Sequence, residues 1–163
     1  FSPREAQLEA FARQLEIAKE TGLPVFLHQR DAHDDFVETL EPALPHLSRA
    51  VAHCFTGEHE SLREYLAMGL YIGITGWICD ERRGKHLHDI VHIIPDDKLL
   101  IETDAPYLLP RTLQPRPKTR RNEPAYLAEV VRVVAEAREQ SVAHVAKITT
   151  ENANRFFNLP PCE

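Results

Sequence analysis

A chain of 163 residues has the length of about one domain, and its composition of 43% hydrophobic and 27% charged residues is that of an ordinary globular protein. The formal net charge of −6 excludes a protein that coats nucleic acid through overall positive charge, so any contact with nucleic acid must be local. No apolar run reaches membrane-spanning length and no secretory leader is recognisable, so we expect no membrane partner.

Four short, nearly all-apolar segments alternate with segments whose apolar residues recur at helical spacing. The predicted elements are, in chain order, a helix over residues 3–21, a strand over 23–28, a helix over 32–44, a strand over 49–53, a helix over 58–68, a strand over 70–75, a helix over 85–94, a strand over 98–103, a helix that begins after residue 122, and a helix over 141–157. Two long connections without a strand separate the later elements, over residues 76–84 and 106–123.

Residues that favour helix ends mark several of these boundaries. Ser2 and Glu5 have the spacing of a capping box, and Gly22 is suited to end the first helix. Asp31 and Asn122 each precede a helical segment and can cap it. We therefore expect side-chain caps at the starts of these three helices.

Strands buried on both faces and joined by crossover helices imply a parallel α/β sheet. The spacing of about 25 to 30 residues between strands fits βαβ units. Either a doubly wound sheet or part of a (β/α)8 barrel would satisfy this pattern, and both folds bind ligands at the carboxyl ends of their strands.

Polar residues follow the apolar part of each strand. His28 and His53 end the first two strands, Thr75 ends the third, and Glu102 and Asp104 come at the end of the fourth. Two imidazoles and a carboxylate at one sheet edge make a mixed nitrogen and oxygen metal site, in which a cation can acidify a water and polarise a phosphoryl oxygen. We predict that His28, His53 and Asp104 converge on one cation; the alternative is a set of hydrogen-bonded structural residues or a loop cap.

The loop over residues 106–123 carries a cluster of basic side chains directly after Asp104. From residue 111 to residue 121 the chain has five basic residues and no acidic ones: Arg111, Arg116, Lys118, Arg120 and Arg121. Such a loop can contact phosphates or can simply be solvated. We take Arg111 and Arg121, together with Arg30 beside the first strand end, as candidate phosphate contacts. Trp77 in the preceding long loop can stack on a base or pack beneath that loop.

The three cysteines are Cys54, Cys79 and Cys162, and their wide spacing matches no zinc or redox motif. An odd number of isolated cysteines predicts free thiols in a reducing compartment. We therefore expect a cytoplasmic protein.

Several segments resemble the TatD family of metal-dependent deoxyribonucleases. The matching segments are residues 25–31 (VFLHQRD), 52–57 (AHCFTG), 73–76 (GITG), 101–108 (IETDAPYL) and 121–124 (RNEP). The resemblance implies a (β/α)8 TIM barrel of the metallo-dependent hydrolase superfamily and divalent metal, either Mg²⁺ or alternatively Mn²⁺ or Zn²⁺, with two ions in the intact protein as one option. It also implies that His28, His53 and Asp104 are metal ligands, with Asp104 in addition a general base, and that the substrate is DNA, cut as a single strand from 3′ to 5′.

The chain departs from this family in lacking its first-strand His-x-His motif and the bridging Glu of its fourth strand. By the resemblance, residues 1–163 are the C-terminal part of a single barrel, covering about strands 5 to 8 and three of six metal ligands. The missing N-terminal half of the same barrel is then a partner of this chain, within a parent protein that we expect to be a monomer. Because the crossover helices cover one face of the strands, we expect the other face and both sheet edges to be open, so that the chain alone associates or aggregates.

Two other functions compete with a nuclease. A small-molecule metallohydrolase, of the lactonase or deaminase type, can use the same fold and ligands. An inactive fragment or binding module is the other alternative, because metal ligands are missing. The basic loop favours a phosphate-bearing substrate over a small neutral one.

Overall fold

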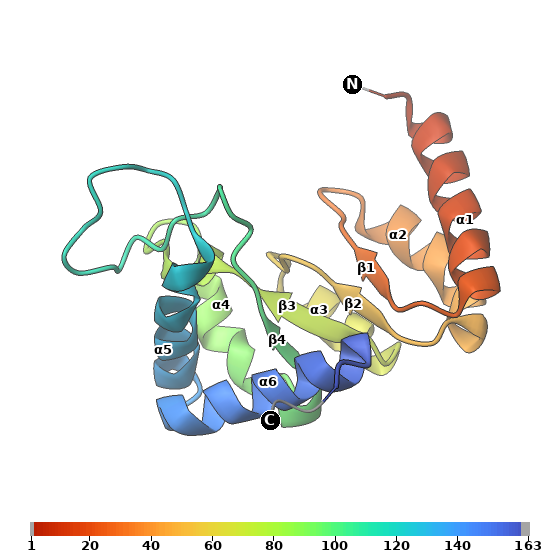
Figure 1. Cartoon of the computed structure of the whole chain (residues 1–163). Helices are drawn as coiled ribbons and strands as arrows, with labels where there is room; N and C mark the ends of the chain where they lie inside the picture. The colour runs from red at the N-terminus through yellow and green to blue at the C-terminus, as the bar shows by residue number, and fades with distance from the viewer. Residues whose placement is uncertain (1, 161–163) are drawn as a thin grey trace.

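The structure is a computed structural model that describes residues 2–160 (Figure 1). The helices are α1 (Arg4–Thr21), α2 (His33–Leu40), α3 (His59–Ala67), α4 (Lys85–Ile90), α5 (Leu127–Ala137) and α6 (Val142–Phe157). The strands are β1 (Val25–Leu27), β2 (Ala50–Ala52), β3 (Tyr71–Ile74) and β4 (Leu99–Ile101). The predicted order of helices and strands is confirmed. Every strand is shorter than predicted, because the residues at its ends lie outside the paired register of neighbouring strands.

Two predicted helices are also shorter, and each continues as a tighter turn. The helix predicted to reach residue 44 ends at Leu40, and a 3₁₀ segment, Glu41–His46, follows it. Pro42 and Pro45 lie in that segment, and proline lacks the N–H that an α-helix needs. The helix predicted to reach residue 94 likewise becomes a 3₁₀ segment, Val91–Ile93, after Ile90.

The four strands form one parallel sheet in the order β1-β2-β3-β4. A doubly wound sheet reverses its strand order at a switch point and carries helices on both faces, whereas a barrel adds strands in sequence and carries its crossover helices on one side. Here the order is sequential and residues from α2, α3, α4 and α5 share one core with alternate strand residues. The sheet is therefore a segment of the barrel type.

The face that carries this core is packed by side chains that alternate along the strands. Leu27 of β1, Ala52 of β2, Ile72 of β3 and Leu99 of β4 are all almost completely buried and belong to it. The sheet thus rests on helices along its whole width.

The opposite face is divided into an apolar part and a polar part. Phe156 of α6 packs against Val51, Tyr71 and Leu100, and all four side chains are almost completely buried. Figure 1 shows α6 running along the lower side of the sheet. The expectation that no helix covers this face is therefore wrong for its lower part, whereas Phe26 at the β1 edge remains 52% exposed.

Three predicted side-chain caps are wrong. α1 begins at Arg4 with Pro3 as the N-cap residue, and α2 begins after Ala32; neither has a side-chain cap, so Ser2 and Asp31 do not cap. Asn122 instead bonds to the preceding loop, as described below. Gly22 does end α1, in the left-handed conformation that glycine adopts without strain.

Two further predictions concern membrane-spanning helices and the cysteines. None of them is long and apolar enough to cross a membrane. Cys54 and Cys79 are free thiols, and Cys162 lies outside the described residues.

Candidate metal centre

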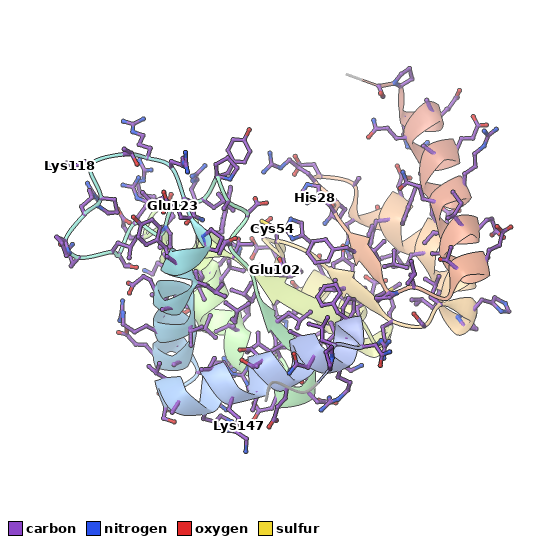
Figure 2. The ribbon with its side chains drawn as sticks, viewed as in Figure 1. His28, Cys54, Glu102, Lys118, Glu123 and Lys147 are labelled. Carbon is purple, nitrogen blue, oxygen red and sulfur yellow. The ribbon has the colours of Figure 1, made fainter. Side chains whose placement is uncertain are left out.

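The carboxyl ends of the strands carry the polar part of the open face. His28 and His53 lie two residues beyond Phe26 and Val51, and Glu102 lies two residues beyond Leu100, so the alternation of strand side chains puts all three on that face. Backbone bonds hold this alignment past the strand ends, because the His53 N–H donates to Leu27 (2.8 Å) and the Glu102 N–H donates to Ile74 (2.9 Å). We call His28, His53, Cys54, Glu102 and Asp104 the strand-end cluster. Figure 2 labels His28, Cys54 and Glu102 of this set.

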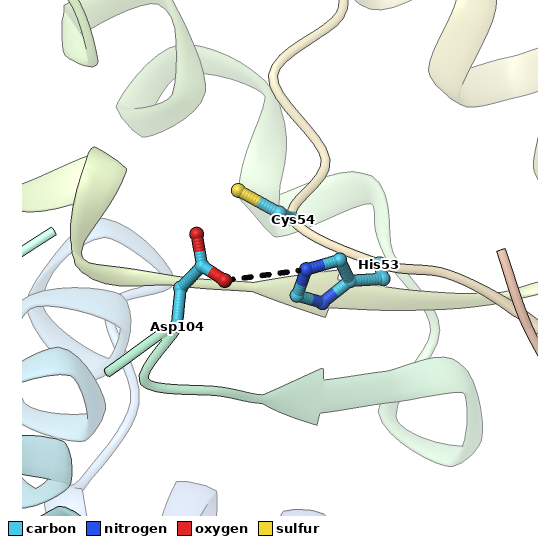
Figure 3. A group of neighbouring side chains, drawn as sticks. All are labelled: His53, Cys54 and Asp104. Carbon is cyan, nitrogen blue, oxygen red and sulfur yellow. Dashed lines mark ion pairs between the residues drawn. The ribbon is translucent and has the colours of Figure 1, made fainter. Parts of the chain in front are cut away.

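His53 is held between the two carboxylates of this cluster. Its Nδ1 lies 2.7 Å from Oε2 of Glu102, and its Nε2 lies 3.5 Å from Oδ1 of Asp104 (Figure 3). The hydrogen bond to Glu102 raises the pKa of His53, against the opposing effect of burial, and the charges of both carboxylates add to the rise. A carboxylate on Nδ1 fixes the proton there when the ring is neutral, which leaves Nε2 as a free ligand atom facing Asp104.

Glu102 has space for its carboxylate only because Gly73 lies opposite it on β3. A Cβ atom at residue 73 would collide with the Glu102 carboxylate. Oε2 also accepts the backbone N–H of Cys54 at 3.1 Å, whereas Oε1 is buried and has no hydrogen-bond partner among the described residues. A buried carboxylate with an unpaired oxygen is unfavourable by itself, so a positive charge nearby would stabilise it.

Two tight turns aim the remaining side chains of the cluster. Cys54 and Asp104 both have positive φ, 49° and 58°, a conformation that few non-glycine residues adopt and that concentrates at functional sites. Asn122 holds the second turn: its Nδ2 donates to the carbonyls of Thr103 (2.7 Å) and Tyr107 (2.8 Å). This side chain is only 3% exposed, so the loop that carries Asp104 is fixed from beneath.

The donor atoms of the cluster suit a divalent cation. One ligand atom each from His53, Cys54 and Asp104 lies within 4.8 Å of the others. Two ligands about 2 Å from one ion are separated by about 3 Å, close to the 3.5 Å between His53 and Asp104. Burial raises the pKa of the Cys54 thiol, which disfavours the thiolate that metals prefer, and Cys54 contacts Thr75 (3.3 Å). The nitrogen and carboxylate donors therefore fit a cation better than the sulfur does.

His28 lies beside this group. Its ring centroid is 5.8 Å from that of His53, and its side chain is exposed. Partial burial and the neighbouring charges of His53 and Arg30 lower the pKa of His28, which favours the neutral ring that binds metals, while Asp104 opposes that shift. The joint coordination of one cation by His28, His53 and Asp104 stays a prediction.

The candidate phosphate contacts occupy different settings. Arg30 is exposed next to His28. Arg111 points its guanidinium at Glu81, with two N–O distances of 3.3 Å, and lines a groove of about 750 Å³ between the loops over residues 76–84 and 106–121. Arg121 lies just past the groove-lining residues, 3.7 Å from Glu123. Arg111 and Arg121 thus each lie beside an acidic side chain, Glu81 and Glu123, that the sequence pattern did not indicate. Their contact with phosphate, and that of Arg30, stays a prediction.

Comparisons with known proteins decide the family. Residues 1–158 match the family model described as TatD related DNase. The chain belongs to the TatD family. It is 55% identical over 159 residues to a protein of Pectobacterium parmentieri named 3′-5′ ssDNA/RNA exonuclease TatD, and 54% identical to a protein of the same name from Erwinia tasmaniensis. Each match covers 98% of this chain and 61% of the relative, so the chain spans about three fifths of the length of these curated relatives.

Solved structures of TatD proteins share the fold. A crystal structure of YJJV, a TATD homolog from Escherichia coli, superimposes with a TM-score of 0.83 at 32% identity, covering 96% of this chain and 58% of the other. A hydrolase TatD family protein from Entamoeba histolytica reaches a TM-score of 0.86 at 23% identity, covering 98% of this chain and 59% of the other. The second likeness shows the fold alone. The family resemblance read from the sequence motifs is confirmed.

Sequence reasoning missed the role of Glu102. The strand pattern places Glu102 at the end of the fourth strand, but we did not predict it as the partner of His53 across the sheet. The alternation Leu100–Glu102 in β4 and Val51–His53 in β2 was the available signal, because both pairs face the same side. Cys54 and Gly73 carried no comparable signal, since their importance depends on what lies opposite them.

Proposed function

We propose that the protein carrying this chain hydrolyses phosphodiester bonds of DNA or RNA, removing nucleotides from the 3′ end of a single strand with the help of a divalent cation. The observation that carries the proposal is the pair formed by His53 Nε2 and Asp104 Oδ1, 3.5 Å apart at the strand ends, with Glu102 occupying the other ring nitrogen. Membership of the TatD family and the exonuclease activity for which its relatives are named support the same activity.

In the strand-end cluster, three side chains serve as metal ligands and Glu102 supports one of them. His28, His53 and Asp104 would hold the cation, for which Mg²⁺ is the first candidate and Mn²⁺ and Zn²⁺ are the alternatives. When bound, a divalent cation polarises a phosphoryl oxygen and makes a nearby water more acidic. Asp104 accepts the proton of the attacking water on the oxygen that does not face His53. Glu102 orients the His53 ring by accepting its Nδ1–H, which leaves Nε2 free for the cation.

The substrate's phosphates meet arginines near the site. Arg30 follows His28 and is exposed to solvent, and Arg111 and Arg121 lie on the loop that follows Asp104. Arginine contacts to phosphate position a strand without reading its sequence, so we expect no base preference from these residues.

The two free thiols support a reducing, cytoplasmic location.

We assign the sheet to strands 5 to 8 of a (β/α)8 barrel, with residues 1–163 as the C-terminal part of a single domain. The sequential strand order, the 52% exposed Phe26 at the β1 edge and the coverage of about three fifths of the relatives support this assignment. Further strands would pair with the β1 and β4 edges, supply more metal ligands and leave room for a second ion, in a protein that acts as a monomer. Expressed alone, the 163-residue chain should self-associate; light scattering that finds a stable, fully active monomer would contradict the assignment.

The decisive experiment removes one donor at a time from the full gene product. Asp104→Asn and His53→Gln should each abolish release of 3′-terminal nucleotides from a 5′-labelled single strand in Mg²⁺ or Mn²⁺. Asp89→Asn, at an exposed position of α4, is the matched control and should keep full activity. Retained activity in either cluster variant overturns the proposal, and hydrolysis of a lactone or deamination of a base in place of strand cleavage would support a small-molecule metallohydrolase instead.

A further inference from the structure

The groove of about 750 Å³ that Arg111 lines lies between two loops, which follow the neighbouring strands β3 and β4. Its walls come from the connection after β3 and from the loop after β4, and we call it the basic groove. The residues that line it are Gly76, Trp77, Asp80, Arg82, Arg83, Leu108, Leu109, Pro110, Arg111, Arg116, Pro117, Lys118, Thr119 and Arg120. Six of these side chains are basic and one is acidic, in a chain whose net charge is −6.

Arg82, Arg83 and Arg111 of the basic groove gather around one buried carboxylate, and Arg111 in addition pairs with Glu81. Asp80 is 4% exposed, and its oxygens lie 3.4 Å from Arg82 Nε, 3.2 Å from Arg83 Nε and 3.8 Å from Arg111 Nε. The Arg83 guanidinium also lies over the Trp77 ring, 4.5 Å from its centroid. These cations are held in place before any ligand arrives, which reduces the entropy lost on binding.

The outer basic residues are not neutralised in this way. Arg116, Lys118 and Arg120 are exposed, and within residues 2–160 no carboxylate oxygen lies within ion-pair distance of any of them. Figure 2 shows Lys118 on the far arc of the loop, away from His28 and Glu102. Three unpaired cations spread along a loop suit a ligand that carries several separated negative charges rather than one compact anion.

The basic groove begins next to the strand-end cluster. Thr75, which contacts Cys54, immediately precedes Gly76 in the groove wall, and Leu108 of the other wall comes four residues after Asp104. A Cβ atom at Gly76 would collide with the Leu108 carbonyl, so the two loops touch at this point. Asn122 fixes the same loop through the carbonyl of Tyr107. The near end of the groove is therefore set by the fold.

We propose that the basic groove binds the phosphate backbone of the uncleaved part of a single nucleic-acid strand, as a binding site separate from the strand-end cluster. This inference rests on the proposed function for the choice of nucleic acid. The six basic side chains contact phosphates, so binding is independent of base sequence. The choice of a single strand rather than a duplex follows from the proposed function, and the duplex measurement in the test below checks it.

The test measures binding, which needs no cleavage. A fluorescent twelve-nucleotide thymidine strand is titrated with the full gene product, without divalent metal, over a range of sodium chloride concentrations. Each phosphate contact on a single strand contributes about 0.7 to the slope of log affinity against log salt, so the variant Arg116→Gln/Lys118→Gln/Arg120→Gln should lose about 2 units of slope and bind more weakly. The charge-keeping variant Arg116→Lys/Arg120→Lys should retain the slope.

A matched control removes the same total charge elsewhere. Arg13, Arg63 and Lys147 are exposed on α1, α3 and α6, and their replacement by Gln should leave the slope unchanged. An unchanged slope in the groove variant, an equal loss in the control, or an equal loss of affinity for a duplex of the same length overturns the proposal. Thermal melting checks that each variant is folded. If the unaltered protein cleaves the strand but the groove variant keeps the full salt slope, the groove proposal is wrong and the proposed function stands. If the groove variant loses slope but the unaltered protein cleaves no phosphodiester bond, the proposed function is wrong and the groove proposal stands.

Discussion

The strand-end cluster and the basic groove both gather charged side chains, but the fold holds them by different means. In the cluster, His53 and Glu102 are 16% and 11% exposed and stand on strands whose backbone bonds continue to the site. In the groove, Arg116, Lys118 and Arg120 are exposed on an irregular loop. The cluster therefore requires a defined geometry that small changes should disrupt, as a metal centre does. The groove requires only a density of charge, as contact with phosphates does.

The largest effect is expected from filling the space opposite Glu102. Gly73→Ala would force the Glu102 carboxylate to move, and we expect it to destabilise the protein by about 3 kcal/mol, as overpacking of a core does. Chemical denaturation measures this loss. The double variant Gly73→Ala/Glu102→Ala should be less destabilised than the sum of its single changes; simple additivity would show that the collision does not involve Glu102.

The next effect concerns the loop that joins the two regions. Asn122→Ala removes both donors to the Thr103 and Tyr107 carbonyls and the acceptor of the Glu123 N–H, so we expect a loss of about 2 kcal/mol in the free energy of unfolding. Asn154→Ala on α6 is the control and should change stability by less than about 0.5 kcal/mol. Equal melting temperatures for the two variants would contradict the role given to Asn122.

A smaller effect is expected when Glu102 keeps its shape and loses its charge. Glu102→Gln should weaken binding of Mn²⁺ to the full gene product about tenfold, or about 1.4 kcal/mol, because the carboxylate makes His53 a stronger ligand. Calorimetric titration measures the affinity. Glu60→Gln, whose side chain is 90% exposed, should bind as the unaltered protein does. An unchanged affinity for Glu102→Gln would leave Glu102 without a part in metal binding.

The smallest effect tests the carboxylate that anchors the groove. Burial raises the pKa of Asp80, but hydrogen bonds from the Arg82 N–H and from the Arg82 and Arg83 side chains outweigh it and lower the pKa to about 2. A carboxyl with a lowered pKa stabilises the folded state above its unfolded pKa of about 3.9, and that contribution disappears as the pH falls through the folded value. We expect Asp80→Asn to be less stable by about 1 kcal/mol, since its arginine partners are largely exposed.

Denaturation at several pH values checks this sign. The difference between Asp80→Asn and the unaltered protein should be constant from pH 7 to about pH 4 and should shrink toward pH 2. A difference that grows as the pH falls would contradict the assignment of Asp80 as a charged anchor.

The sequence by itself determined the order of strands and helices, the parallel sheet, the family and the residues at the strand ends. These follow from local patterns: apolar runs of strand length, and polar residues such as His53 and Asp104 that come directly after them. The pattern of strands and helices alone left open the choice between a doubly wound sheet and a barrel segment, because that choice depends on which strands pair. The family resemblance indicated the barrel, and the strand order agrees with it.

Only the tertiary structure decided which residues face one another. The bond from His53 to Glu102 joins positions 49 residues apart, and the place left by Gly73 for that carboxylate is a property of two neighbouring strands. Asn122 has the local signature of a helix cap, yet it bonds to carbonyls 15 and 19 residues earlier because the loop folds back over it. Local patterns set where a side chain stands along its own element, whereas packing between distant elements sets its partners, and the partners determine its chemistry.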